Sequence, residues 1–295
     1  MLTLETLAGL FETHPAAASA RVKEFSVGGR HFNFNSRPAI MGVVNLSADS
    51  WYRESVCLSA EAAIQRGRTL AAQGADIIDV GAESTLAQAA RVGSSAQKTR
   101  LVPVIQALRA EKILVSVETY SPAVTRASLA AGASILNLTG TRGSQSIYRL
   151  VAAHGAAVII CFMAGNHVRE VGDFDLRADP IPLLHDFFAR QIELAQRCGV
   201  ENIFLDPGLG FYYRNLQDSS VRVRHQMKVF LNTFRLRDLG FPVCQALPHA
   251  FEFFREEVRS AEPFFALLAA LGKTDLFRTH EVPRIRAVLE TLKVY

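Results

Sequence analysis

The chain has 295 residues, of which 49% are hydrophobic and 20% charged, a composition typical of a globular protein with an ample core. Its net charge of +4 comes from scattered basic residues, which favours an anionic small molecule rather than nucleic acid as the ligand. No apolar run reaches the roughly 18–20 residues of a membrane span, and the N-terminus lacks the basic-then-apolar order of a signal peptide, so we expect no membrane association.

The first part of the chain differs from the rest. Residues 1–20 predict a short helix followed by an alanine-rich link. Residues 21–34 alternate around Gly28-Gly29 in the way that a β-hairpin does. We therefore predict that residues 1–37 form a helix and hairpin extension that closes one end of the following domain.

From Pro38 onward, strand-like and helix-like segments alternate. Buried parallel strands are predicted near 39–45, 75–82, 112–118, 134–138, 156–163, 202–206, 242–247 and 275–278. Helices are predicted at about 59–73, 97–110, 122–131, 145–154, 181–198, 225–239, 251–271 and 283–293. This alternation predicts an α/β fold, a single (β/α)8 TIM barrel over residues 38–295. A doubly wound open sheet is the alternative, disfavoured because no glycine-rich dinucleotide turn is present.

The four cysteines stand apart from one another, at positions 57, 161, 198 and 244. They form no CxxC pair and no Cys/His spacing typical of a metal site. The pattern predicts neither disulfides nor a structural zinc, and it favours a cytoplasmic location.

Polar side chains follow most of the predicted strands at the point where each strand ends. In chain order they are Asn45, Glu83, Glu118, Asn137, Asp206 and the pair Arg278 and His280. Because the carboxyl ends of the strands meet at one mouth of such a barrel, these side chains should share one site. Asp79, four residues before Glu83 on the same strand face, is interpreted as a buried acid that bridges strands.

Two of these strand ends carry the clearest chemistry. Asp206 begins the sequence Asp-Pro-Gly-Leu-Gly-Phe, where a carboxylate could accept two parallel hydrogen bonds from an N–C–N edge. Arg278 and His280 suit a diphosphate oxygen. A structural turn at Asp206 and a surface pair at Arg278 and His280 remain the alternatives.

The other strand ends are less specific. The loop at 45–50 combines Asn, Ser and Asp side chains, which suit an oxyanion or Mg²⁺ but also occur in ordinary turns. Asn137 offers a donor and an acceptor, as a heterocycle edge would require, and Glu118 is an acceptor or a base. Either residue could instead cap a helix.

Taken in order, these segments resemble the motifs of the dihydropteroate synthase family, within the pterin-binding (β/α)8 superfamily. The resemblance runs from about Pro38 to the C-terminus. Its motifs are Ile40–Asn45, Ile78–Thr85, Val115–Tyr120, Asn137, Leu205–Phe211 and Arg278–Val282.

The resemblance implies an enzyme that joins p-aminobenzoate to a 6-hydroxymethylpterin diphosphate with loss of diphosphate. It assigns Asp206, Glu118 and His249 to catalysis, and Glu118, Asn137, Asp206 and Met163 to the pterin. It assigns Asn45, Thr85, Arg278 and His280 to the diphosphate, with Mg²⁺ at Asn45. It also implies a homodimer.

The sequence departs from the family pattern at several positions. Leu247-Pro248-His249 replaces a Ser-Arg-Lys segment, Leu86 replaces an arginine, Tyr212 or Tyr213 a lysine, and Glu118 and Leu138 each an aspartate, while Trp51 and Tyr52 add aromatic character. These changes favour a transferase with an altered second substrate. A pterin-dependent methyltransferase and a non-catalytic pterin-binding paralogue or subunit are the alternatives.

Overall fold

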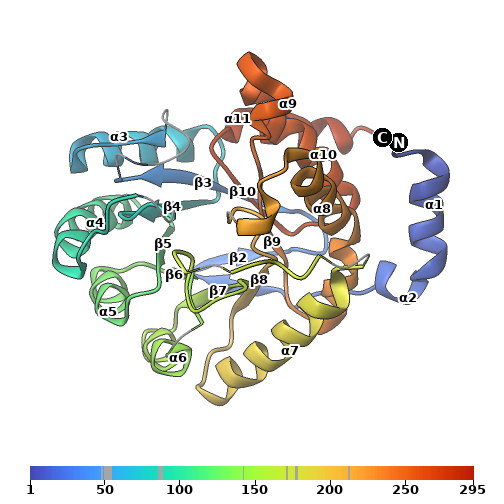
Figure 1. The fold of residues 1–295 in the computed structure, drawn as a ribbon. Coiled ribbons are helices and arrows are strands. Elements are labelled where there is room, and N and C mark those ends of the chain that lie inside the picture. The colour runs from blue at the N-terminus through green and yellow to red at the C-terminus, as the bar shows by residue number, and fades with distance from the viewer. Residues whose placement is uncertain are drawn as a thin grey trace.

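The computed structural model describes residues 1–47, 49, 55–85, 89–141, 143–170, 172–176, 179–211 and 213–295. Within this part of the chain, parallel strands form a central barrel and helices pack around its outside (Figure 1). The barrel strands are β3 (Ala39–Asn45), β4 (Ile77–Gly81), β5 (Val115–Thr119), β6 (Ile135–Leu138), β7 (Ala157–Cys161), β8 (Ile203–Asp206), β9 (Cys244–Ala246) and β10 (Leu276–Thr279).

The strands pair in parallel in the order β8-β7-β6-β5-β4-β3-β10-β9. A parallel bridge between Leu205 and Val243 joins the two ends of this sheet, with Leu205 N–H donating to the Pro242 carbonyl at 3.0 Å. The sheet is thereby closed, which confirms the predicted (β/α)8 barrel.

The outer helices follow the predicted alternation. They are α3 (Ala60–Ala72), α4 (Ser94–Ala110), α5 (Pro122–Ala131), α6 (Ser144–Ala153), α7 (Ile181–Arg197), α8 (Ser219–Asn232), α10 (Ala261–Leu271) and α11 (Val282–Leu292). Ser59 and Ser121 cap α3 and α5, each accepting a backbone N–H, and Pro122 and Pro283 stand in the first turns of α5 and α11.

Two predicted helices differ from the structure. The helix predicted at 225–239 begins earlier, at Ser219, because the Asp218 side chain caps it by accepting the Val221 N–H at 2.9 Å. It continues after Asn232 as the 3₁₀ helix η3 (Thr233–Leu239). The helix predicted at 251–271 is divided into α9 (Phe251–Phe254), η4 (Arg255–Ser260) and α10, and the break falls at Arg255, where φ is 44°.

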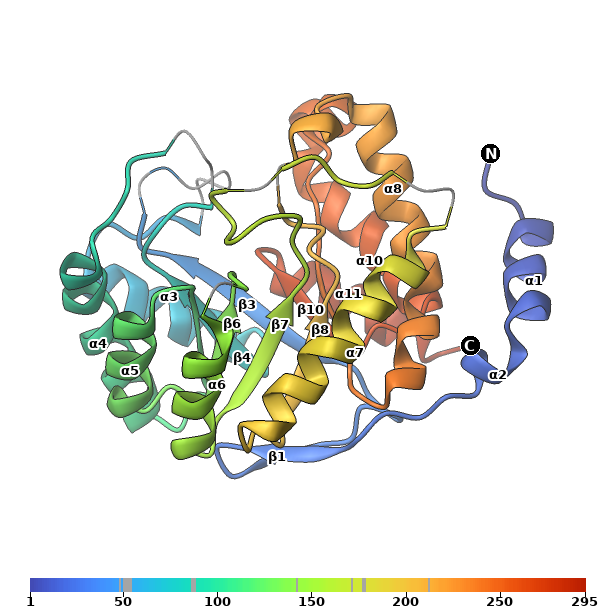
Figure 2. The ribbon, with the colours of Figure 1, turned by 60° about the horizontal axis from the view of Figure 1, so that its bottom comes forward.

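The predicted hairpin consists of β1 (Phe25–Val27) and β2 (Arg30–Phe32), joined through Gly28 and Gly29 with φ of 55° and 84°. It lies across the end of the barrel opposite the long loops (Figure 2). Its aromatic side chains join the apolar interior of the barrel: the rings of Phe25 and Phe34 lie 5.2 and 5.4 Å from that of Phe204. The hairpin therefore closes the barrel floor, as predicted.

The predicted N-terminal helix is α1 (Leu4–Thr13), which buries none of its residues. The alanine-rich segment predicted to be a link forms a second short helix, α2 (Pro15–Ala18). A membrane-crossing helix is not found among the described residues, since none of their helices is both long and apolar enough. The cysteines are free thiols, and Cys57, Cys161 and Cys244 are buried.

Candidate active site

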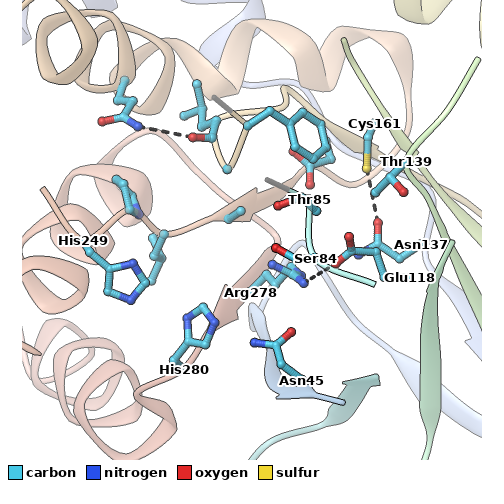
Figure 3. A pocket seen from close by; sticks show the side chains of 18 of the residues that line it. Asn45, Ser84, Thr85, Glu118, Asn137, Thr139, Cys161, His249, Arg278 and His280 are labelled. Atoms are coloured by element: carbon cyan, nitrogen blue, oxygen red, sulfur yellow. Dashed lines mark hydrogen bonds and ion pairs between the residues drawn. The ribbon is translucent and has the colours of Figure 1, made fainter. Parts of the chain in front are cut away.

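A cavity of about 330 Å³ opens at the carboxyl ends of the barrel strands. The predicted site residues that line it are Asn45, Thr85, Glu118, Asn137, Asp206, His249, Arg278 and His280 (Figure 3). Met163, which was assigned to the pterin, is not among the residues that line this cavity; it belongs to the cluster of apolar side chains in the barrel interior and is 4% exposed. The strand ends thus meet at one mouth, as the barrel topology requires.

A chain of polar contacts crosses the floor of this cavity. Arg278 Nε donates to Asp79 Oδ2 at 2.8 Å, and its Nη2 donates to Glu118 Oε2 at 2.7 Å. Asn137 Nδ2 donates to the same Asp79 oxygen at 3.1 Å, which confirms that Asp79 is a buried acid bridging strands. Arg278 therefore balances two carboxylates inside the barrel, a contact that its assignment to the diphosphate did not foresee.

Asn137 is held from the other side as well. The Cys161 thiol donates to Asn137 Oδ1 at 3.2 Å, so the amide bridges a thiol on β7 and a carboxylate on β4. These contacts fix the orientation of the amide at the cavity wall.

Asp206 and Glu118 are carboxylates in a poorly solvated cavity. Burial raises the pKa of Glu118 to about 7, although the adjacent Arg278 guanidinium opposes this effect. Burial also raises the pKa of Asp206 to about 6, against the hydrogen bond that the Gly208 N–H donates to its Oδ1 at 2.8 Å. Both groups therefore titrate close to neutral pH, as groups that bind or exchange protons with a substrate do.

The Asp206 carboxylate is positioned by the backbone turn that follows it. Gly208 has a φ of 77°, and a Cβ at this position would lie 2.2 Å from the Phe162 carbonyl oxygen. Only glycine fits such a left-handed conformation at so close a backbone approach. The Pro-Gly sequence after the acid is thus required by the turn that presents it.

The side chain at the end of β3 is also held in one orientation. Asn45 Nδ2 donates to Ser55 Oγ at 2.6 Å, which orients the side-chain amide. Asn45 lies beside Arg278 and His280 in the cavity (Figure 3), because β3 and β10 are neighbouring strands. An amide oxygen is a ligand that Mg²⁺ accepts, so the residue type fits the predicted metal role.

His249 and His280 share a partner that the sequence had not indicated. Glu262, on α10, accepts a hydrogen bond from His280 Nδ1 at 2.9 Å and lies 3.1 Å from His249 Nε2. Burial opposes ionisation of Glu262, but its contacts with the two histidines hold its pKa well below the usual range. A polar residue inside the apolar run 261–271 was the available signal.

Arg169 and Tyr120 were also not foreseen. Arg169 Nη1 donates to the Ser84 carbonyl at 2.9 Å, and the Tyr120 hydroxyl donates to Glu83 Oε2 at 2.7 Å. These contacts connect the loop after β4 to the loops after β5 and β7. Glu83 therefore has structural partners at the rim, beside its place in the cavity wall.

Several predicted rim residues lie outside the described residues, namely Trp51, Tyr52, Leu86 and Tyr212. Tyr213 is described and is 2% exposed. Its ring contacts Phe174 at 5.1 Å rather than lining the cavity mouth.

The profile of the family described as "Pterin binding enzyme" matches residues 41–244. The dihydropteroate synthase type-2 of Escherichia coli is 31% identical over 275 residues, which cover 88% of this chain and 97% of that relative. The chain belongs to the dihydropteroate synthase family.

Solved structures from this family agree with the fold. The Xanthomonas albilineans dihydropteroate synthase with 4-aminobenzoic acid superposes with a TM-score of 0.77 at 29% identity, covering 92% of this chain and 97% of that one. The same enzyme in complex with 7,8-dihydropteroate gives a TM-score of 0.73 at 26% identity, with coverage of 92% and 97%. The structural resemblance to these relatives therefore covers 92% of this chain.

Proposed function

We propose that the protein joins a 6-hydroxymethyl-dihydropterin diphosphate to an arylamine with loss of diphosphate, and that its amine specificity differs from that of its relatives. The observation that carries this proposal is the cavity itself. Two carboxylates line it, the buried Asp206 and the largely buried Glu118, whose side chain is 11% exposed. Glu118 lies on one side of the cavity, and the imidazoles of His249 and His280 lie on the other (Figure 3). The complexes solved for the X. albilineans relative contain the corresponding amine and product.

The carboxylate side suits the heterocycle. An N–C–N edge of a pterin offers parallel N–H donors, which one carboxylate accepts in pairs. Asp206 is held in place by the Gly208 N–H at 2.8 Å, and Asn137 adds an amide between two fixed partners. Negative charge here also stabilises the ring as it becomes electron-deficient during the reaction.

The opposite side suits the leaving group. The bond between the 6-methylene carbon and the diphosphate oxygen breaks, and its electron pair leaves with the diphosphate. The amine nitrogen then forms the new C–N bond and loses a proton. His280 and Arg278 would stabilise the charge that develops on the diphosphate, and anion binding of this kind lowers the barrier to departure.

Asn45 fits a magnesium ion, because its amide oxygen is a hard ligand at the cavity wall and its orientation is fixed by Ser55 at 2.6 Å. When bound, Mg²⁺ would neutralise diphosphate oxygens. Asn45 and Thr85 are then the residues of this chain that position the anion from the β3 and β4 side.

The altered specificity rests on His249. The family resemblance places a lysine in this segment, whereas here an imidazole reaches the cavity and turns toward Glu262 at 3.1 Å. A lysine ammonium is a mobile point charge, but this imidazole is held by a buried acid. We propose that an amine other than p-aminobenzoate is preferred, in a cytoplasmic homodimer.

The test is a direct assay of the purified protein with Mg²⁺, 6-hydroxymethyl-dihydropterin diphosphate and a panel of arylamines that includes p-aminobenzoate. Diphosphate release and the coupled product are both measured. Asp206→Asn should lower kcat/KM about 100-fold, since one preorganised charged contact is lost. Asp238→Asn, at a surface side chain that is 49% exposed, is the matched control and should leave turnover unchanged.

Failure to release diphosphate with any amine would contradict the proposal. Calorimetric binding of the pterin without turnover would then identify a non-catalytic pterin-binding paralogue or subunit. Methyl transfer from methyltetrahydrofolate to a corrinoid protein, retained after loss of Arg278 and His280, would instead identify a pterin-dependent methyltransferase.

A further inference from the structure

Three side chains with metal-ligand chemistry meet at one wall of the cavity. His249 follows β9, Glu262 lies in the first turn of α10, and His280 follows β10. One potential ligand atom from each lies within 4.8 Å of the other two. His249 and His280 face the cavity side by side (Figure 3), and their ring centroids are 5.1 Å apart.

The Glu262 carboxylate is held so that one oxygen faces both imidazoles. The oxygen that points away from the imidazoles, Glu262 Oε2, accepts a hydrogen bond from the Thr279 hydroxyl and another from the His280 backbone N–H at 3.1 Å. Thr279 Oγ1 in turn accepts the Glu281 N–H at 2.9 Å, so the hydroxyl proton is left to point at Glu262. The oxygen that faces both imidazoles is Glu262 Oε1, which lies 2.9 Å from His280 Nδ1 and 3.1 Å from His249 Nε2.

These contacts have the form of a metal site with its supporting shell. Metal-bound nitrogen and oxygen lie about 2.0–2.2 Å from the ion, which in a tetrahedral site brings neighbouring ligand atoms to about 3.3–3.6 Å from each other. The separations of 2.9 and 3.1 Å seen here need to widen by only a few tenths of an ångström to admit the ion. Two imidazoles and one carboxylate form a donor set that leaves further coordination positions open. Thr279 and the backbone N–H groups supply the outer hydrogen bonds that orient such a carboxylate.

Charge balance points the same way. Glu262 is completely buried, and a buried carboxylate requires compensating positive charge or strong donors. Among the described residues it faces two imidazoles and accepts hydrogen bonds from the Thr279 hydroxyl and the backbone N–H groups of His280 and Glu281. All of these groups are neutral when the histidines are unprotonated. A divalent cation supplies the balancing charge and uses neutral imidazoles as ligands.

We infer that His249, Glu262 and His280 bind a divalent transition metal ion of the zinc class. The open coordination positions face the cavity, because His249 and His280 line it and Glu262 lies behind them. An oxygen of an anionic ligand can therefore complete the coordination. If the proposed function holds, that ligand is the substrate diphosphate, and this second part of the inference rests on it.

Metal binding is tested without any substrate. Tag-free protein, freed of metal with a chelator, is titrated with Co²⁺ while the visible d–d absorption is recorded, and Zn²⁺ is then added as competitor. One Co²⁺ per chain, displaced by Zn²⁺, is the expected result. His249→Ala and Glu262→Gln should each weaken binding at least about 100-fold, because changes in the outer shell alone cost about 10–100-fold.

Two further variants sharpen the titration. Thr279→Val keeps all three ligands but removes the hydroxyl that orients Glu262, and it should weaken Co²⁺ binding roughly 10–100-fold. His185→Ala removes a histidine that pairs with Asp238 at the surface, and it should bind Co²⁺ as the wild type does. Circular dichroism establishes that each variant is folded, and His249→Gln replaces His249→Ala if the latter is not.

A folded wild-type protein that gives no d–d bands, or that binds Co²⁺ as tightly after His249→Ala or His249→Gln, would overturn the metal site. The histidines would then share the Glu262 carboxylate through protons alone. Inorganic pyrophosphate added to the Co²⁺ protein should change the bands, since it reaches the open positions. Unchanged bands would refute the second part only. Because turnover is not measured, failure here is distinct from failure of the proposed function.

Discussion

The Glu118 carboxyl group forms an ion pair with Arg278, yet its pKa is higher than that of an ordinary glutamate. Burial favours the protonated form more strongly than the Arg278 guanidinium favours the ionised form. Its pKa rises from 4.5 in the unfolded chain to about 7 in the folded protein. The favourable contribution of the neutral form is therefore complete below about pH 4.5 and is lost as pH rises through about 7.

This shift predicts a pH-dependent difference between the wild type and Glu118→Gln, whose amide does not titrate. From pH 5 to pH 8 the free energy of unfolding of the wild type should fall relative to the variant by on the order of 1–3 kcal/mol. Urea unfolding at several pH values measures it. Glu193→Gln, at a side chain that is 66% exposed, should track the wild type, and parallel curves for Glu118→Gln would contradict the predicted shift.

The sequence predicts which residues line the cavity where a polar residue stands at the end of a predicted strand. Asn45, Asn137, Asp206 and His280 were placed in the cavity from sequence because barrel topology brings strand ends together. The partners were not predictable in the same way. Glu262 reaches His280 across 18 positions of sequence and Arg278 reaches Asp79 across 199, and both contacts depend on side-chain directions that only the packed barrel determines.

The turn after β8 determines how Asp206 is presented, and Gly208 is its critical element. Gly208→Ala would place a Cβ 2.2 Å from the Phe162 carbonyl oxygen at a φ of 77°. We expect a loss of roughly 2–4 kcal/mol in the free energy of unfolding, from the left-handed conformation and the overpacking together. Pterin affinity should fall as well, because the turn carries the carboxylate.

Gly240→Ala separates the two causes. This glycine has a φ of 81°, but no atom lies within 4 Å of a Cβ placed there. It should cost only about 1–2 kcal/mol and leave pterin binding intact. Urea unfolding and calorimetry compare the two variants, and equal stability losses would contradict the steric argument.

The strands and most helices could be predicted from the sequence, because runs of buried β-branched residues and glycines at helix C-termini are local signals. The division of 251–271 was not predictable in this way. Arg255 adopts a φ of 44°, a conformation that nothing in its residue type favours, and α10 restarts only at Ala261. The break lets Glu262 stand at the beginning of a helix, behind the two histidines.

The hairpin closes the barrel floor, so the extension contributes to the stability of the whole molecule. Phe34 is 4% exposed and its ring meets that of Phe204 edge-on at 5.4 Å. Phe34→Ala should lower the free energy of unfolding by roughly 3–5 kcal/mol, as a large buried aromatic does when truncated. Phe11→Ala, on α1 and 61% exposed, should stay within about 0.5 kcal/mol.

Thermal or urea unfolding distinguishes these variants. A small loss for Phe34→Ala would mean that the barrel is stable without its hairpin, and residues 1–37 would then form a dispensable appendage rather than the floor of the domain.

The junction of β8 and β9 gives the closed sheet a point where it can begin to open. Elsewhere neighbouring strands pair over continuous registers, but here the described contact is the Leu205–Val243 bridge. Pro242 has no N–H to donate, and the Val243 N–H is directed to Asp275 Oδ2 at 2.9 Å. Hydrogen–deuterium exchange should therefore be faster at the Leu205 amide than at Val80 in the β3–β4–β5 ladder. Local opening of the barrel would then begin next to Asp206, the residue after Leu205, so the same opening would also change how a ligand reaches the Asp206 carboxylate.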